Sequence, residues 1–160
     1  MNAVVKIRKA VHPHPYPQER DDVPGTHRVF VKKLWGCPYN LAVAPWTDAS
    51  AEAQLASVRK SLAKSLFMLP LFRTGGSIIL WLGPEDGWRP HVDGIRPDKT
   101  GLHINIVQGL IWLDPETGVY ELGPTQWGSH KFGNLSGQFT VLQETLENWT
   151  NPEHHGGQLT

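Results

Sequence analysis

The sequence contains a single cysteine, Cys37, among its 160 residues. One cysteine cannot form a disulfide within the chain, and it excludes a metal site built only from cysteines. A lone cysteine is compatible with a reducing compartment, and we expect a cytoplasmic protein. The cations among the first nine residues are followed by no apolar core, so we expect no secretory signal.

Long apolar runs and an excess of one charge are missing as well. The two longest apolar runs, residues 77–82 and 107–113, are far shorter than the roughly 20 residues of a membrane-spanning helix. The 15 lysines and arginines balance 15 aspartates and glutamates, so the formal net charge is zero. No overall field therefore draws the chain to nucleic acid or to an anionic membrane. We expect a soluble protein with neither of these as a partner.

The motifs of the common enzyme classes are also absent. The chain contains no G-x-S-x-G, no P-loop, and no G-x-G-x-x-G after a strand. Several carboxylates fall in predicted turns, but turns recruit such residues for solvation and local hydrogen bonds. We therefore expect no cofactor.

What is present describes a small globular protein. Its composition, with 39% hydrophobic and 19% charged residues, is typical of globular proteins. Its 160 residues are enough to bury one hydrophobic core. We predict a single α+β domain, with a mostly antiparallel sheet of five or six strands and two amphipathic helices packed on it. The predicted strands are residues 27–34, 41–45, 77–82, 102–113 and 118–122, and the predicted helices are residues 48–69 and 135–149.

The clearest strand pattern runs from Gly101 to Gly123. Apolar and polar side chains alternate from Leu102 onward, which is typical of a strand with two different faces. Residues 114–118, Asp-Pro-Glu-Thr-Gly, then place proline early and glycine late, as a tight turn requires. We predict that this turn joins two strands in a hairpin.

The two helices are predicted from apolar residues at spacings of three and four, which form one stripe on each helix. Pro70 ends the first helix, and Asn134 is the expected cap of the second. The predicted core combines these stripes with the inward faces of the strands. Its members are Val29, Val31, Leu55, Val58, Leu62, Leu66, Ile79, Leu80, Leu82, Ile104, Ile106, Leu110, Phe139, Leu142 and Leu146.

The N-terminal segment differs from the rest in composition. Residues 3–7 alternate weakly and predict an edge strand, and prolines 13, 15 and 17 favour an extended chain. We therefore divide the chain into an extended proline-rich arm at 1–26, one α+β domain at 27–150, and a flexible tail at 151–160. The arm is expected to lie loosely on the domain or to become ordered on a partner.

One set of residues could bind a metal. His91 and Asp93, together with a distal histidine such as His130, have the residue types of the facial triad of non-haem iron oxygenases. His103 and His154 are alternatives for the third ligand. Against this hypothesis, His91 and Asp93 follow no clear strand, and the chain has fewer strands than a jelly roll requires. A non-haem metal-dependent enzyme is therefore the alternative function.

The order of elements near the C-terminus resembles the C-terminal part of the SUKH immunity superfamily. In that superfamily a similar hairpin, here residues 110–122, precedes a closing helix, here residues 135–149. The early Asn-Gly-Gly signature of such proteins is replaced here by Thr-Gly-Gly at 74–76. The resemblance implies a small α+β module that works by binding another protein.

We therefore predict a non-enzymatic protein-binding module, such as an immunity or inhibitor protein, or a small subunit of a larger assembly. Tryptophan, tyrosine and arginine dominate the energetics of protein interfaces. The expected anchors of those types are Tyr16 in the arm, Trp88 and Arg89 in the loop at 84–101, and Trp127 in the loop at 124–133. The expected partner is another protein.

Overall fold

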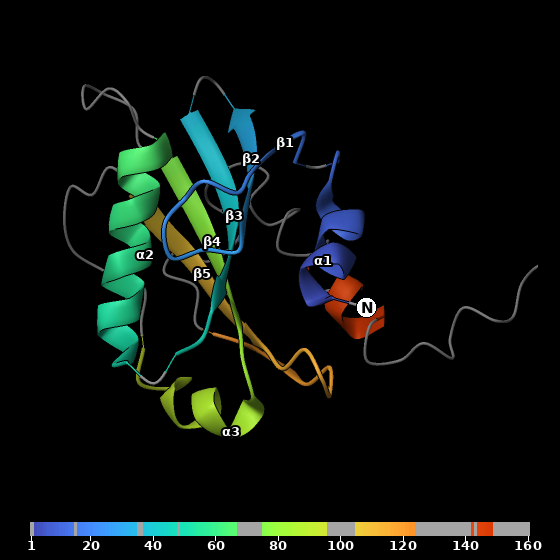
Figure 1. Ribbon diagram of the computed structural model, residues 1–160, viewed down its shortest axis with the longest axis vertical. Helices are drawn as coiled ribbons and strands as arrows, with labels where there is room; N and C mark the ends of the chain where they lie inside the picture. The colour runs from blue at the N-terminus through green and yellow to red at the C-terminus, as the bar shows by residue number, and fades with distance from the viewer. Residues whose placement is uncertain are drawn as a thin grey trace, which may run out of the picture.

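The sheet at the centre of the molecule has six strands that follow one another in chain order, from β1 to β6. The computed structural model describes residues 2–14, 16–34, 37–47, 49–66, 75–95, 105–123, 142 and 144–148. Helix α2 lies along one face of the sheet, helix α1 lies on the other side, and α3 lies at one end (Figure 1). Among the described helices, none is long and apolar enough to cross a membrane.

Three of the five strand pairs are antiparallel, and the two central pairs, β3–β4 and β4–β5, are parallel. The predicted α+β domain with a mostly antiparallel sheet is therefore confirmed. Parallel neighbours cannot be joined by a tight turn and need a crossover connection. Helix α2 (Ala51–Leu66) lies in the first crossover, and α3 (Glu85–Trp88) with the 3-10 helix η1 (Arg89–His91) lies in the second. The strands are β1 (Gln18–Arg20), β2 (Arg28–Leu34), β3 (Cys37–Pro45), β4 (Gly75–Leu82), β5 (Asn105–Leu113) and β6 (Tyr120–Leu122).

Apolar side chains cover both faces of the sheet. On one face the core contains the stripe of α2 and the buried residues that follow α3, including Val92 and Ile95. On the other face the core contains buried residues of α1 (Ala3–Val11) together with Leu142 and Leu146. Leu142 and residues 144–148, which include Leu146, are helical. A strand buried on both faces is apolar along its whole length, and this explains the continuous run in β4.

Strand β5 contains a β-bulge that keeps its core residues on the correct face. Ser77 of β4 pairs with Val107, whereas the next residue, Ile78, pairs with Gly109. Gln108 is therefore an additional residue in β5 with no partner in β4. Such an insertion shifts the side chains that follow it to the opposite face of the sheet. Val107 and Leu110, three positions apart, consequently both lie in the core under α2.

Most of the predicted core is confirmed. Every predicted core residue whose side chain is described is buried, except Leu66, which packs partly buried against the core. The side chains of Ile104, Ile106 and Phe139 lie outside the described residues. The first predicted helix, 48–69, is observed as α2 over Ala51–Leu66, and Asp48 and residues 67–69 lie outside the described residues.

The prediction of an edge strand at residues 3–7 is wrong. These residues begin helix α1, whose N-terminus is capped by the Asn2 side chain, which accepts a hydrogen bond of 2.9 Å from the Val4 amide. The buried residues Ala3, Ile7 and Val11 recur every four positions, which is the period of a helix face. Burial of this helix face against the sheet favours the helix over the strand that the alternation of residues 3–7 had predicted.

Two further expectations need correction. The arm expected at 1–26 contains α1 and also β1, which pairs with Val29–Val31 of β2 as the edge strand of the sheet. The loop expected at 84–101 begins with α3 and η1, whose buried residues Trp88 and Val92 pack into the core. The loop at 124–133 and the tail at 151–160 lie outside the described residues.

Replacement of Gly123 by alanine tests the close packing at the edge of this sheet. A Cβ atom there would lie 2.5 Å from Cζ3 of the buried Trp112 and 3.1 Å from the Leu110 carbonyl oxygen. We expect Gly123→Ala to lower the free energy of unfolding by about 2–3 kcal/mol, measured by urea denaturation, because the core must be overpacked.

Gly25→Ala is the matched control. Gly25 has a φ of +79°, but a Cβ atom there would have no neighbour within 4 Å, so only backbone strain of about 1 kcal/mol is expected. Equal losses in the two variants would contradict the packing of Gly123 against Trp112.

Candidate functional site

The carboxyl ends of β3, β4 and β5 meet at one end of the sheet because these strands are parallel. In many open α/β sheets a ligand-binding crevice forms at such strand ends, where successive connections leave on opposite faces. Here both connections pack on the same face, since residues of α2 and of the α3–η1 segment belong to one core. Helix α3 lies at this end of the sheet (Figure 1), and the described connections do not leave on opposite faces.

Trp46, the residue after β3, links this end together. Its amide donates to the Leu82 carbonyl oxygen at 2.7 Å, and its indole Nε1 donates to the Gly87 carbonyl oxygen in α3 at 3.1 Å. The ring meets Trp81 edge to face at a centroid distance of 5.7 Å. It lies 5.5 Å from the His91 ring and remains half-buried.

A glycine after β4 makes room for that ring. A Cβ atom on Gly83 would lie 2.7 Å from the Cβ atom of Trp46, closer than real side chains approach. The Gly83 carbonyl oxygen also accepts a hydrogen bond of 2.9 Å from the indole of Trp88. Gly83 thus contacts both tryptophans, through its Cα side with Trp46 and through its carbonyl oxygen with Trp88.

Arg89 is held in one place on the surface of α3. Its guanidinium carbon lies 5.4 Å from the centroid of the buried Trp88 ring, within the range of a cation–π contact. Its Nε donates to a Glu85 carboxylate oxygen at 2.5 Å, four residues earlier. The side chain is nevertheless 51% exposed, so a positioned cation faces the solvent.

Asp114 joins the β5–β6 turn to α3. One carboxylate oxygen accepts from the amides of Glu116 and Thr117 at 2.8 and 3.3 Å, and the other accepts from the Glu85 amide at 3.2 Å. Burial alone would raise the pKa of Asp114, but these amide hydrogen bonds outweigh it and hold the pKa below its ordinary value. The turn is the predicted one, and Gly118 has the expected positive φ of 77°.

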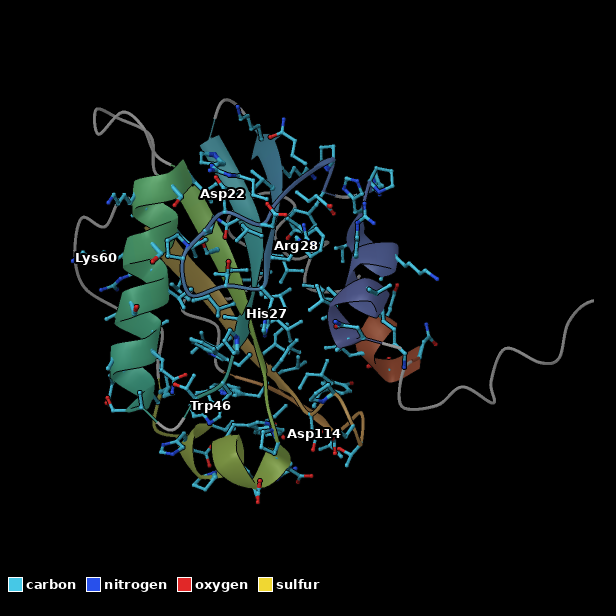
Figure 2. The ribbon with its side chains drawn as sticks, viewed as in Figure 1. Asp22, His27, Arg28, Trp46, Lys60 and Asp114 are labelled. Carbon is cyan, nitrogen blue, oxygen red and sulfur yellow. The ribbon has the colours of Figure 1, made fainter. Side chains whose placement is uncertain are left out.

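We call the solvent-facing residues Trp46, Glu85, Asp86, Arg89 and His91 the α3 surface. Asp86, Arg89 and His91 are exposed, and Trp46 and Glu85 are partly so. Figure 2 shows Trp46 and Asp114 close to α3, with Lys60 farther along the sheet, on α2. The α3 surface combines an aromatic ring, a histidine, a cation and two carboxylates.

The four predicted anchors have different positions. Arg89 lies exposed on the α3 surface, and Trp127 lies outside the described residues. Trp88 and Tyr16 are buried with 0% exposure, so neither offers its ring to a partner in this conformation. The Trp88 ring makes a cation–π contact with Arg89. Tyr16 packs in the core with buried residues of α1, and this burial raises the pKa of Tyr16 above its ordinary value.

Trp46 is the site residue that the sequence reasoning missed. It directly follows the predicted strand at 41–45, and in parallel sheets the residues that follow strands commonly lie in the binding site. Because a mostly antiparallel sheet was predicted, the position of Trp46 after a strand was not taken as evidence for a site.

The metal hypothesis gains no support from the local geometry. His91 and Asp93 are both exposed, and Val92 between them has helical dihedral angles of −55° and −46°. Positions i and i+2 in a helical conformation do not face each other, whereas a facial triad needs both ligands on one side. Among the described residues no group of three metal-binding side chains occurs, and His130 lies outside them.

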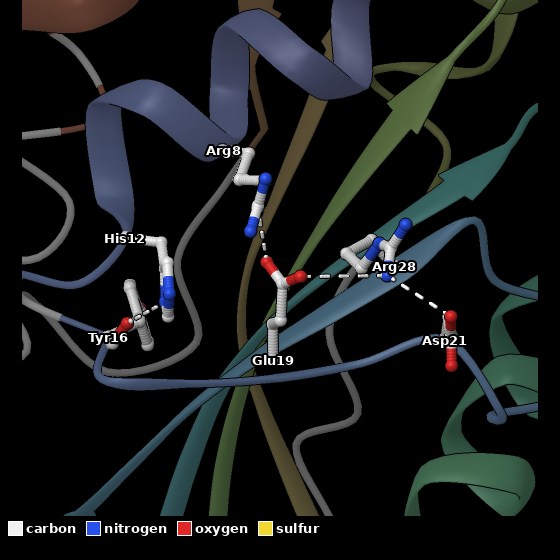
Figure 3. A network of polar contacts seen from close by, with 6 residues as sticks. All are labelled: Arg8, His12, Tyr16, Glu19, Asp21 and Arg28. Carbon is white, nitrogen blue, oxygen red and sulfur yellow. Dashed lines mark hydrogen bonds and ion pairs between the residues drawn. The ribbon is translucent and has the colours of Figure 1, made fainter.

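A second cluster of charges lies at the β1 edge of the sheet (Figure 3). Glu19 pairs with Arg8 of α1 at 2.7 Å and with Arg28 at 3.7 Å, and Arg28 pairs with Asp21 at 3.3 Å. The hydrogen bond from Arg8 lowers the pKa of Glu19. Each charge is matched by an opposite one, so this cluster ties α1 to the sheet and presents no net charge to a ligand.

No protein-family model, curated protein or solved structure matches the chain. The resemblance to the SUKH superfamily therefore stays a prediction.

The role of Asp114 can be tested with Asp114→Ala. The variant removes the acceptor of three amides, and we expect a loss of about 2 kcal/mol in the free energy of unfolding. Glu116→Ala is the control in the same turn, because Glu116 is exposed, and it should change stability by less than about 0.5 kcal/mol. Similar losses in both variants would show that Asp114 does not hold the turn and α3 together.

Elemental analysis of the purified, untagged protein after anaerobic iron loading tests the metal hypothesis. The helical conformation between His91 and Asp93 leads us to expect iron and zinc well below one atom per chain. One iron per chain that is lost in His91→Ala would overturn this expectation and make an enzyme the leading interpretation.

Proposed function

We propose that the protein is a non-enzymatic protein-binding module of the cytoplasm, which contacts its partner through the α3 surface. An immunity or inhibitor protein and a small subunit of a larger assembly are both functions of this kind. The proposal concerns the mode of action and leaves the partner to be identified by experiment.

The observation that carries the proposal is the pair of contacts that Arg89 makes with Trp88 and Glu85 while 51% of its side chain is exposed. Most exposed arginines lose side-chain freedom when a partner binds, and that loss weakens binding by about 0.5–1.5 kcal/mol for each side chain ordered. Arg89 already contacts the ring of Trp88 and pairs with the carboxylate of Glu85, and both contacts restrict its side chain before a partner binds. A positioned arginine is typical of the residues that contribute most to interface affinity.

The half-buried Trp46 supports the same function. Its indole N–H is used by the Gly87 carbonyl oxygen, so its exposed part is apolar surface at a fixed place. Tryptophan is enriched at interfaces because a large rigid ring buries much area at low entropic cost. The exposed carboxylate of Asp86 adds a charged residue for the rim of such an interface.

The alternative, a metal-dependent enzyme with His91, Asp93 and His130, has no comparable support. The two described ligands lie on a helical turn that separates their side chains. Among the described residues, the connections through α2 and through α3–η1 pack on one face, so they do not form the switch point at which α/β enzymes usually bind substrates.

Site-specific photo-crosslinking in the cells that naturally produce the protein tests the proposal. The photoreactive residue p-benzoylphenylalanine is introduced at Asp86, on the α3 surface, or at Lys60, on the outer side of α2; both positions are exposed. We expect a discrete protein adduct at position 86 and none at position 60. Arg89→Ala in the position-86 variant should reduce the adduct at least tenfold, a loss of about 1.4 kcal/mol in affinity.

Lys64→Ala, which also removes an exposed cation, is the matched control and should leave the adduct unchanged. An adduct at position 60 alone would show that the protein binds through α2, and the surface assignment would be wrong. The absence of adducts at both positions would contradict binding through the α3 surface.

A further inference from the structure

Gln54 is a polar residue on the buried face of α2. It is 7% exposed and directly precedes the core residue Leu55. Glutamine is mostly found on protein surfaces, because a buried amide group is destabilising unless it forms hydrogen bonds. An apolar side chain would therefore suit this position better if packing were its only role. The hydrogen bonds of Gln54 show what else the residue does.

The side-chain amide of Gln54 reaches back beyond the N-terminus of α2. The hydroxyl oxygen of Ser50 caps this helix by accepting a hydrogen bond of 3.2 Å from the Ala53 amide. Gln54 Nε2 donates to the carbonyl oxygens of Thr47 and Ala49, each at 2.7 Å, and Gln54 Oε1 accepts from the Thr47 amide at 3.0 Å. Two carbonyl oxygens and one N–H fix the orientation of the side-chain amide, because only its nitrogen can donate.

These hydrogen bonds hold the backbone directly after Trp46. Thr47 is an exposed residue, yet both its N–H and its carbonyl oxygen are bonded to Gln54. The Trp46 amide itself donates to the Leu82 carbonyl oxygen, and its indole donates to the Gly87 carbonyl oxygen. Figure 2 shows Trp46 beside α3, at the end of the sheet where α2 begins. Trp46 is therefore held by β4, by α3 and, through Thr47, by α2.

We propose that Gln54 is a positioning residue of the α3 surface, which holds Trp46 in place through the backbone of Thr47. Fixing the Thr47 amide fixes the whole peptide unit that joins it to Trp46, because that unit is planar. Packing covers only part of the Trp46 ring, so this constraint on its backbone adds to its order. The consequence for a partner rests on the proposed function: a ring that is ordered in advance loses less freedom on binding.

NMR of the free protein labelled with ¹⁵N-tryptophan tests the position of Trp46. Gln54→Met keeps the length of the side chain but removes its three hydrogen bonds. We expect the solvent exchange of the Trp46 indole proton to become about tenfold faster or more, because its bond to Gly87 opens more often. The indole proton of Trp88, which donates to the Gly83 carbonyl oxygen, is the internal control and should keep its exchange rate. Trp46→Phe assigns the Trp46 signal.

Leu62→Val is the matched control variant. It removes one methylene group from a side chain that is 0% exposed and lies about 12 Å farther along α2 than Gln54. It should lower stability without changing the exchange of either indole proton. Unchanged exchange at Trp46 in Gln54→Met, or equal acceleration at Trp46 in both variants, would overturn the positioning role. If Gln54→Met does not fold, Gln54→Glu takes its place, since it keeps an acceptor for the Thr47 amide but loses both donors.

The contribution to binding is tested separately, by photo-crosslinking from position 86. Gln54→Met should reduce the protein adduct about threefold or more, because Trp46 is then no longer ordered before the partner binds. An adduct that forms at position 86 and is not weakened by Gln54→Met would overturn the contribution of Gln54 to binding. The absence of this adduct without the Gln54 substitution would contradict the proposed function instead, and the NMR result would still decide the positioning of Trp46.

Discussion

The parallel pairing of β3, β4 and β5 is the constraint on which the rest of the molecule depends. Parallel neighbours need crossover connections, and these are almost always right-handed. Since the three strands also follow one another in order, both connections must cover the same face of the sheet, as they do. The opposite face is left to segments from the two ends of the chain, α1 and the helical residues 144–148.

The same pairing brings together residues that are far apart in the sequence. Trp46, Gly83 and Asp114 each directly follow one of the three parallel strands, so they meet at one end of the sheet. Trp46 and Asp114 both bond to backbone groups of α3, and Gly83 leaves space for Trp46. A helix of only four residues is not stable alone, and these contacts keep α3 and its Arg89 in place.

Two patterns that involve only local residues were predicted correctly from the sequence, whereas the local pattern at residues 3–7 was not. The turn at 114–118 and the stripe of α2 depend on near neighbours, and both were predicted. The parallel pairing of β4 depends on partners more than 25 residues away, so no local pattern contains it. Trp88 was assigned to the surface because it lies among turn-forming residues, whereas its ring fills the core beneath α3. In α1 the apolar residues Ala3, Ile7 and Val11 recur every four positions, but the alternation at residues 3–7 was taken as a strand pattern instead.

Hydrogen–deuterium exchange tests most directly whether the α3 surface is the contact surface of the protein. The exchange of backbone amides would be measured by mass spectrometry for the protein alone and for its complex purified from the cells that produce it. The account predicts slower exchange in the complex at residues 83–95 and no change along the outer side of α2. Protection on α2, with residues 83–95 unchanged, would contradict it.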